Sequence, residues 1–313
     1  MAQTLERLTN RTDTMRSLRS IVRTMKTMSA INALPYEQAA QAIEAYRETT
    51  LLGFHAFVRN YGPLPQTSAI EAQPIVIVFG SDHGLCGNYN EIVAEKAKQV
   101  LDRLHVPKVI CIGAQMEDAL FGQGISPEST LLPPANADGL QRLSGRLIGL
   151  LDQMRTTSPA QDISVTLVFT KRAPHAQHLQ VSKTLLPLDP EIAAGFADKP
   201  WKSRSLPYFS LPPDTLLAAL IRSYLFAEIY GAAAEAMVTE NAARLARMQQ
   251  AERSVDDQLE GLTAEMRSVR QSEITTELLD IIIGFEALKP RDKPKRKNQQ
   301  RNPGCVTSQH RKP

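Results

Sequence analysis

The sequence has little cysteine, few aromatic residues and no long uninterrupted apolar run. Its 313 residues include only Cys86, Cys111 and Cys305, which are too few and too far apart for a disulfide framework or a clustered zinc site. No run of 18 or more apolar residues occurs, so we expect no direct membrane span. The N-terminus lacks the charged-then-apolar pattern of a secretory signal. We therefore expect the chain to remain in a reducing cytoplasm.

Net charge is also small until the last 25 residues. Lys289–Pro313 carries nine Lys or Arg against Asp292 alone, a net charge of +8, so the preceding 288 residues carry −5. The Lys/Pro/Asn/Gln composition of 289–313 cannot bury a core and predicts a basic disordered tail. Such a tail could bind anionic lipid or RNA, but a solvated extension is the simpler interpretation, and no nucleic-acid partner is expected.

Helical periodicity is abundant near the C-terminus. Residues 216–288 contain no proline and predict one long helix, which would measure about 110 Å at 1.5 Å per residue. Its middle carries apolar residues at alternating steps of three and four, interrupted only by Glu252. They are Leu245, Met248, Val255, Leu259, Leu262, Met266 and Val269. Asp214 is the expected N-cap. Such an apolar seam requires a partner helix.

The N-terminal residues 3–60 supply that partner. Their first apolar line is Leu5, Leu8, Met15, Leu18, Val22, Met25 and Met28, and a second is Ala39, Ala42, Ile43, Tyr46, Thr50, Phe54 and Phe57. Pro35 should kink the helix or end it after Leu34. A basic stripe of Arg16, Arg19, Arg23 and Lys26 is either a solvated face or a contact with acidic loops of a partner.

The period changes between Pro74 and Leu206. Buried strands are predicted at 75–79, 109–112 and 165–169, with helices at 91–104, 115–121 and 139–154 and a further strand at 179–186. The predicted fold is a long antiparallel coiled coil of N- and C-terminal helices with an inserted Rossmann-like α/β domain whose sheet is mainly parallel. The predicted segments are an N-terminal arm (1–62), the α/β domain (74–206), the C-terminal helix (212–288) and the tail (289–313).

A glycine-rich loop, Gly80–Asn90, follows the first strand, where α/β proteins bind phosphate. Its spacing matches neither common phosphate-binding motif and it lacks the lysine of a P-loop, so a tight structural turn is the alternative. Cys86 near His83 could be an activated nucleophile or a buried small hydrophobe. His175 and His178 lack further ligands and are expected at the surface.

Three separated segments resemble the gamma subunit of rotary F-type ATP synthases. Gly80–Asn90 resembles the family's S-[TS]-D-R-G-L-C-G-x-x-N, with His83 in place of Arg, and Leu185–Leu188 resembles a leucine-proline strand end. The most extensive match is Leu217–Leu288, with identities at Tyr230, Glu240-Asn241-Ala242-Ala243-Arg244, Met248, Arg270-Gln271, Ile274-Thr275 and Glu277-Leu278. Ile21–Ala30 matches less well, and Ile31–Pro35 replaces a basic segment. That departure and the tail suggest a divergent branch, such as the N-type ATPases.

The resemblance implies a non-catalytic central stalk without a cofactor or metal site. Its helices would turn inside a ring of alpha and beta subunits, while the α/β domain and an epsilon subunit engage the membrane c-ring rotor. The complex would lie on the cytoplasmic face of the bacterial inner membrane. The residues expected to contact the catalytic ring are Met25, Lys26, Arg270, Gln271, Thr275 and Glu277.

Two other functions are compatible with the residues alone. One is an α/β enzyme that binds a phosphate-bearing ligand at Gly80–Asn90 and dimerises through its helices. The other is a coiled-coil adaptor without rotary partners.

Overall fold

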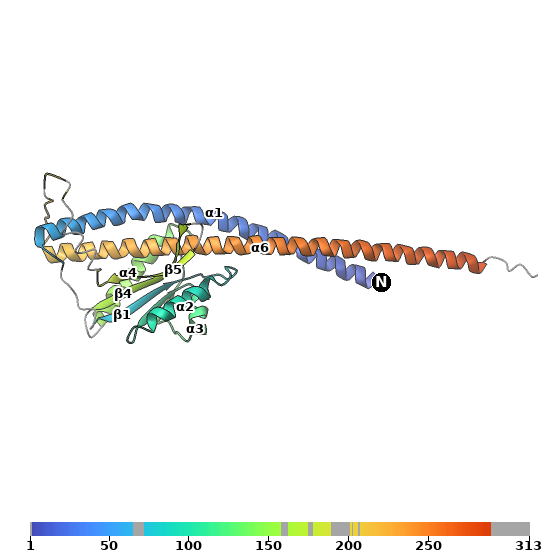
Figure 1. Ribbon diagram of the computed structural model, residues 1–313, viewed down its shortest axis with the longest axis horizontal. Coiled ribbons are helices and arrows are strands. Elements are labelled where there is room, and N and C mark those ends of the chain that lie inside the picture. The colour runs from blue at the N-terminus through green and yellow to red at the C-terminus, as the bar shows by residue number, and fades with distance from the viewer. Residues whose placement is uncertain are drawn as a thin grey trace, which may run out of the picture. The chain divides into compact units, whose positions relative to one another are not determined.

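The computed structural model describes residues 2–64, 72–157, 162–174, 178–188, 201, 203–205 and 207–288. The chain divides into two compact units, one of residues 14–259 and one of residues 1–13 with 260–313. Helices α1 (Ala2–Tyr61) and α6 (Pro213–Leu288) each contribute to both units (Figure 1). The predicted tail, Cys305 and His175 lie outside the described residues. The limits of the four predicted segments remain a prediction.

The larger unit contains the predicted α/β sheet. Its strands are β1 (Gln73–Phe79), β2 (Lys108–Ile112), β3 (Ser129–Leu131), β4 (Ile163–Arg172) and β5 (His178–Leu186), in the order β3-β2-β1-β4-β5. All neighbours are parallel except β4 and β5, which are antiparallel. The helices are α2 (Tyr89–Leu101), α3 (Ala114–Gly122) and α4 (Gly139–Thr157). The Rossmann-like prediction is confirmed, although β3 was not predicted because three residues carry too little pattern.

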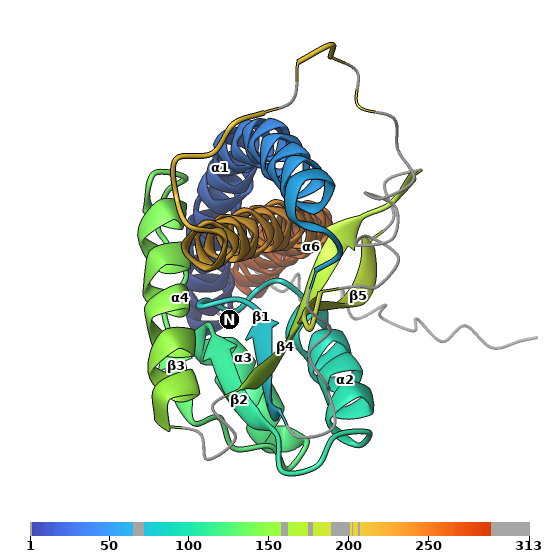
Figure 2. The ribbon, with the colours of Figure 1, turned by 90° about the vertical axis from the view of Figure 1, so that its left-hand side faces the viewer.

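Both faces of this sheet are covered by helices. Alternate side chains of the strands point to opposite faces, so Ile75 and Ile77 pack with α4 and α6, whereas Val76 and Val78 pack with α2 and α3. Figure 2 shows α4 and α2 on opposite sides of the strands. The coiled-coil helix α6 therefore forms part of the core of the α/β domain.

In the larger unit, α1 and α6 lie side by side and their buried positions follow the predicted seam of α6. Met248 is 3% exposed, and Leu245, Val255 and Leu259 are half-buried. On α1 the facing line differs from the prediction, because Leu18 is 41% and Met28 is 53% exposed. Their places in the seam are taken by polar residues, the half-buried Arg19 and the buried Ser29.

Two predictions about helix ends are corrected. Helix α1 does not end at Leu34 but continues through Pro35 to Tyr61. Ile31 and Leu34 are exposed there, so the backbone carbonyl that loses its helical donor to proline lies on the solvent side. Helix α6 begins at Pro213, a favoured first helical residue, so Asp214 lies in the first turn instead of at the N-cap.

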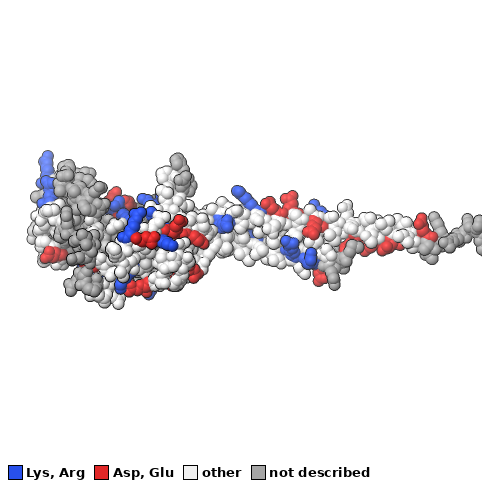
Figure 3. Space-filling view, turned by 60° about the horizontal axis from the view of Figure 1, so that its bottom comes forward, with Lys and Arg blue, Asp and Glu red and all other residues white. Residues whose placement is uncertain are grey.

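In the smaller unit, the start of α1 packs on the later turns of α6. Leu8 and Thr12 of α1 and Leu262 of α6 are buried, and the Thr12 hydroxyl lies 3.4 Å from the sulfur of Met266. Further along α6 the large apolar side chains are exposed. They are Ile274, Leu278, Leu279, Ile281, Ile282, Ile283 and Phe285. Uncharged surface covers most of these last turns in Figure 3.

Helix α6 contains an 18-residue stretch with a mean hydropathy of 1.3 and few charges. By length and composition alone, this helix could cross a membrane. Of that stretch, 39% is buried, and core helices of soluble proteins have the same composition.

Candidate functional site

Lys26, one of the predicted contact residues, is bound within the coiled coil. Its Nζ lies 2.5 Å from Oε2 of Glu252, and Nε of Arg23 lies 2.9 Å from Oε1 of the same carboxylate. The Glu252 side chain is only 14% exposed, and the hydrogen bonds from Lys26 and Arg23 lower its pKa. The residue that interrupts the apolar seam is therefore the acceptor of two cations from the partner helix. Met25 is half-buried beside them.

The basic stripe of α1 continues this pairing one turn away. Nε of Arg19 lies 2.7 Å from Oδ1 of Asp256 on α6. Arg19, Arg23 and Lys26 are thus each paired with a carboxylate of α6, although the Arg23 side chain is still 58% exposed. A contact of this stripe with a partner stays a prediction. Ion pairs of this kind at the flanks of a coiled coil fix the register of its helices.

The other predicted contact residues lie on the exposed surface of α6 in the smaller unit. Arg270, Gln271, Thr275 and Glu277 are exposed, and the Thr275 hydroxyl donates to the carbonyl of Gln271 over 2.8 Å. Within the described part of the chain, Arg270 and Glu277 make no hydrogen bond or ion pair. Glu277 also lines a groove of about 710 Å³ with Glu6 of α1 and Asp280. These side chains are exposed, whereas Lys26 is half-buried in an ion pair; the contacts of all six residues with a partner stay a prediction.

The glycine-rich loop is closed by its own side chains. The amide of Asn90 accepts from the backbone N–H of Ser81 over 3.0 Å and donates to the Ser81 hydroxyl over 2.7 Å. The Ser81 carbonyl accepts from the N–H groups of Gln115 and Met116 in the first turn of α3. Oδ1 of Asp82 accepts from the N–H of Ala114. The first N–H groups of α3 are therefore used to join that helix to the loop, and the Ser81 N–H is used within the loop.

Cys86 lies inside this closed loop. It is 5% exposed, its sulfur is 3.5 Å from the Ser81 hydroxyl, and burial raises the pKa of its thiol. The imidazole of His83 is 84% exposed, and only the backbone carbonyl of His83 lies near the sulfur, at 4.0 Å. Because an activated cysteine needs a lowered pKa and a nearby base, this arrangement favours the buried hydrophobe over the nucleophile.

The loop is also fixed to α6. Nη2 of Arg244 donates to the carbonyl of His83 over 3.1 Å and pairs with Oε1 of Glu240 over 2.6 Å. The phenol of Tyr89 donates to the carbonyl of Ala236 over 3.1 Å. Arg244 of the family-like segment therefore joins the α/β domain to the long helix, and Glu240 of the same helix pairs with it.

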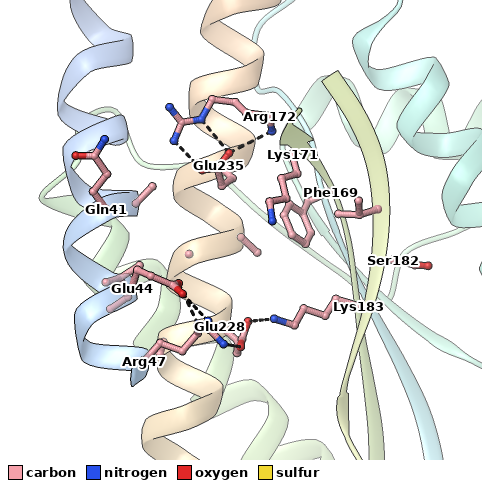
Figure 4. Close-up of a pocket in the computed structure, with 16 residues that line it drawn as sticks. Gln41, Glu44, Arg47, Phe169, Lys171, Arg172, Ser182, Lys183, Glu228 and Glu235 are labelled. Carbon is pink, nitrogen blue, oxygen red and sulfur yellow. Dashed lines mark hydrogen bonds and ion pairs between the residues drawn. The ribbon is translucent and has the colours of Figure 1, made fainter. Parts of the chain in front are cut away.

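A charged cavity of about 610 Å³ between α1, β4, β5 and α6 was not predicted (Figure 4). Arg172 at the end of β4 pairs with Glu37 of α1 and with Glu235 of α6, and Lys183 of β5 pairs with Glu228 of α6 over 2.6 Å. The sequence does hold a signal for it: Glu228 and Glu235 are seven residues apart and therefore share one helical face.

Among the described residues, no group of three or more His, Cys, Asp or Glu could hold a metal ion. His178 is exposed at the start of β5, as expected of a surface histidine.

Comparisons with known proteins agree with this architecture. A family model described as ATP synthase matches residues 4–288. The ATP synthase gamma chain of Granulibacter bethesdensis is 28% identical over 266 residues, which cover 80% of this chain and 88% of that protein. The gamma chain of Mycobacterium leprae is 26% identical over 254 residues, which cover 79% and 83%.

Two solved structures share the fold. A chain of the Euglena gracilis mitochondrial ATP synthase, solved as OSCP, F1 and c-ring, has a TM-score of 0.67 at 17% identity and covers 96% of this chain and all of that one. A chain of the rotor of the same enzyme has a TM-score of 0.59 at 14% identity, covering 88% of this chain. The family model matches residues 4–288, and the chain has paired terminal helices around an inserted Rossmann-like domain. This chain therefore belongs to the ATP synthase gamma-chain family.

Proposed function

We propose that this chain is the central-stalk rotor subunit of a rotary ATP synthase, coupling ion translocation through a membrane sector to ATP synthesis or hydrolysis in a catalytic ring. The observation that carries the proposal is the pairing of α1 and α6 around an α/β domain, in a chain that matches the gamma family from residue 4 to residue 288. As a gamma chain it is a subunit of ATP synthase, and we infer that it has no catalytic site of its own.

The physical role of such a stalk follows from its asymmetry. Catalytic sites of identical sequence differ in nucleotide affinity only if something contacts each of them differently. To invert a 1:99 distribution between two states of a site, the contacts must differ by about 5.5 kcal/mol. The exposed apolar and polar side chains of residues 270–285 are a surface on which such contacts can form.

The proposed partners are the alpha and beta subunits around the helices, and an epsilon subunit and the c-ring at the α/β domain. Support comes from the solved relatives, one of which was solved with F1 and c-ring. The proposed location is peripheral, at the cytoplasmic face of the bacterial inner membrane.

The proposed contact residues Arg270 and Gln271 can be tested in the assembled complex. We expect Arg270→Ala/Gln271→Ala to reduce ATP-driven formation of a membrane potential per ATP hydrolysed, because it removes two proposed contacts with the catalytic ring. The fold should stay intact, since both side chains are exposed and support no internal contact of α6. A matched control is Gln141→Ala/Arg142→Ala, an exposed Gln–Arg pair on α4. Equal potential per ATP in the two variants would contradict the assignment.

Two simpler experiments separate the alternatives. Alpha and beta subunits should co-purify with the chain, which an adaptor without rotary partners does not predict. Titration of the isolated chain with ATP should leave its melting temperature unchanged, since Ser81 and Asn90 of the loop bind one another and the loop lacks the lysine of a P-loop. Saturable micromolar stabilisation by ATP would instead support the enzyme interpretation.

A further inference from the structure

The α/β domain is joined to α6 and to α1 by different kinds of contact. Helix α6 contributes many side chains to the core under the sheet, among them Leu225, Ile229 and Val238. In that same core, α1 contributes only Tyr36 among the buried residues and Ala39 and Ala40 among the half-buried ones. Under the sheet, apolar packing therefore joins the domain mainly to α6, and α1 contributes few apolar side chains there.

This difference matters for rotation. Contacts to α1 as well as to α6 add resistance to a twist of the domain about the axis of α6. If torque enters through the α/β domain, as the proposed function implies, the contacts to α1 decide whether both helices turn with it.

Arg172 makes such a double attachment. Its Nη1 pairs with Glu37 of α1, while Nη2 lies 2.8 Å from Oε1 and Nε 3.2 Å from Oε2 of Glu235 on α6. The backbone N–H of Arg172 also donates to Glu235, over 3.3 Å. The planar guanidinium can bind two carboxylates at once, which an ammonium group does less well.

Lys183 and Arg47 make a second attachment. Nζ of Lys183 on β5 lies 2.6 Å from Oε2 of Glu228, and Nη1 of Arg47 on α1 lies 3.8 Å from Oε1 of the same carboxylate. Glu228 is only 7% exposed. Since Glu228 precedes Glu235 by seven residues, the two attachments are about 10 Å apart along α6. Figure 4 shows them at two levels of the helix.

A third contact lies on the other side of α1. Tyr36 is 2% exposed, and its phenol donates over 2.8 Å to the carbonyl of Pro134, in the segment that precedes α4. Tyr36 and Glu37 are neighbours in sequence, so α1 is joined to the domain from two directions at one level.

We propose that Arg172, and Lys183 together with Arg47 through their shared carboxylate Glu228, are positioning residues that make the α/β domain, α1 and α6 turn as one body. Glu37 and Glu235 are the anchors of Arg172. The inference rests on the proposed rotor function. It assigns torque transmission to the charged cavity of Figure 4 and needs no ligand there.

The test is a measurement of angular fluctuation in the intact complex. A rod is attached to the α/β domain, the catalytic ring is fixed and stalled, and the width of the angular distribution is recorded. We expect Arg172→Met/Lys183→Met to broaden the distribution, because methionine keeps an unbranched apolar stem at each position but removes the charged group. Arg172→Lys should broaden it less, because a single ammonium retains part of the pairing.

Arg222→Met is the matched control. Arg222 of α6 pairs over 2.6 Å with Asp152 of α4, so it joins the same domain to α6 without touching α1, and both side chains are well exposed. Its angular width should equal that of the unmodified complex. If the double variant is no broader than this control, the proposal is overturned.

A milder variant covers the case in which the double variant does not assemble. Glu37→Gln changes a side chain that is 40% exposed and removes only the charge on α1. It must also broaden the distribution, and an unchanged width would overturn the proposal. Absence of the chain from purified complexes of the unmodified protein would instead refute the rotor function itself.

Discussion

Replacement of Arg244 by methionine should leave the buried carboxylate of Glu240 without its counter-ion. The Glu240 side chain is 4% and the Arg244 side chain 13% exposed, and the two groups lie 2.6 Å apart. Oε2 of Glu240 has no hydrogen-bond partner among the described residues, so Arg244 is the main group that compensates this charge.

The expected cost follows from that burial. Removing one partner of a buried ion pair typically costs about 3–5 kcal/mol, because the remaining charge stays desolvated. With a urea dependence of about 1–3 kcal/mol per molar, a loss of about 3 kcal/mol lowers the unfolding midpoint by about 1–3 M. Adding Glu240→Gln to Arg244→Met should recover most of this loss, since a neutral amide is cheaper to bury than a carboxylate.

Urea unfolding of the full-length chain can be followed by the fluorescence of Trp201, the single tryptophan. Its ring lies 5.2 Å from that of His55 on α1, in the same unit as Glu240 and Arg244. Equal destabilisation of the single and double variants would refute the reasoning, because the loss would then come from packing or from the hydrogen bond to His83.

The pH dependence gives a second check. Burial raises the pKa of Glu240 above its ordinary 4.5, while Arg244 lowers it, so Arg244→Met should raise the pKa further. A carboxyl group with a raised pKa binds its proton more tightly in the folded state, so the stability it confers at low pH is lost as the pH rises through that pKa. The difference in the free energy of unfolding between variant and wild type should therefore be largest at neutral pH and shrink as the pH falls toward 4.5. A constant difference would contradict the prediction.

Three further predictions concern packing, backbone and ionisation. Leu262→Ala, at a position 6% exposed, should cost about 2–5 kcal/mol in urea unfolding, whereas Leu18→Ala on the outer face of α1 should cost far less. Gly113→Ala should destabilise the chain, because Gly113 has φ +108° and an added Cβ would lie 2.3 Å from the Ser81 carbonyl oxygen, whereas Gly122→Ala meets nothing within 4 Å. Burial raises the pKa of Tyr36 to about 12, so Tyr36 should contribute to a fall in stability as the pH rises from 10 to 12, and Tyr36→Phe should remove that contribution.

The sequence predicted the fold wherever hydrophobic periodicity was strong. The line from Leu245 to Val269 identified the seam of α6, and the branched runs identified β1, β2 and β4. It failed where polar side chains occupy buried positions, as at Arg19 and Ser29 of α1, because an apolar pattern cannot register a charge whose partner lies more than 200 residues away.

The candidate site shows the same limit. Lys26 pairs with Glu252, a residue that looked like an interruption of the seam, and this internal pairing was not predicted. The expected contact of Lys26 with the catalytic ring stays a prediction. Arg270 and Gln271 are exposed in the smaller unit; their contact with the catalytic ring stays a prediction. The cavity of Arg172 and Lys183 joins four elements distant in sequence, and only the three-dimensional register of β4 and β5 on the helices brings its charges together.

The sharing of Arg172 between carboxylates of two helices restricts how this chain can diverge. Reversing the charge at position 172 would need simultaneous changes at Glu37 and Glu235, which are separated by nearly 200 residues of chain. A substitution at one of the two carboxylates leaves the other still bound to Arg172. Sequence change at these three sites should therefore begin with neutral replacements of Glu37, the most exposed of the three, before Glu235 or Arg172 can vary.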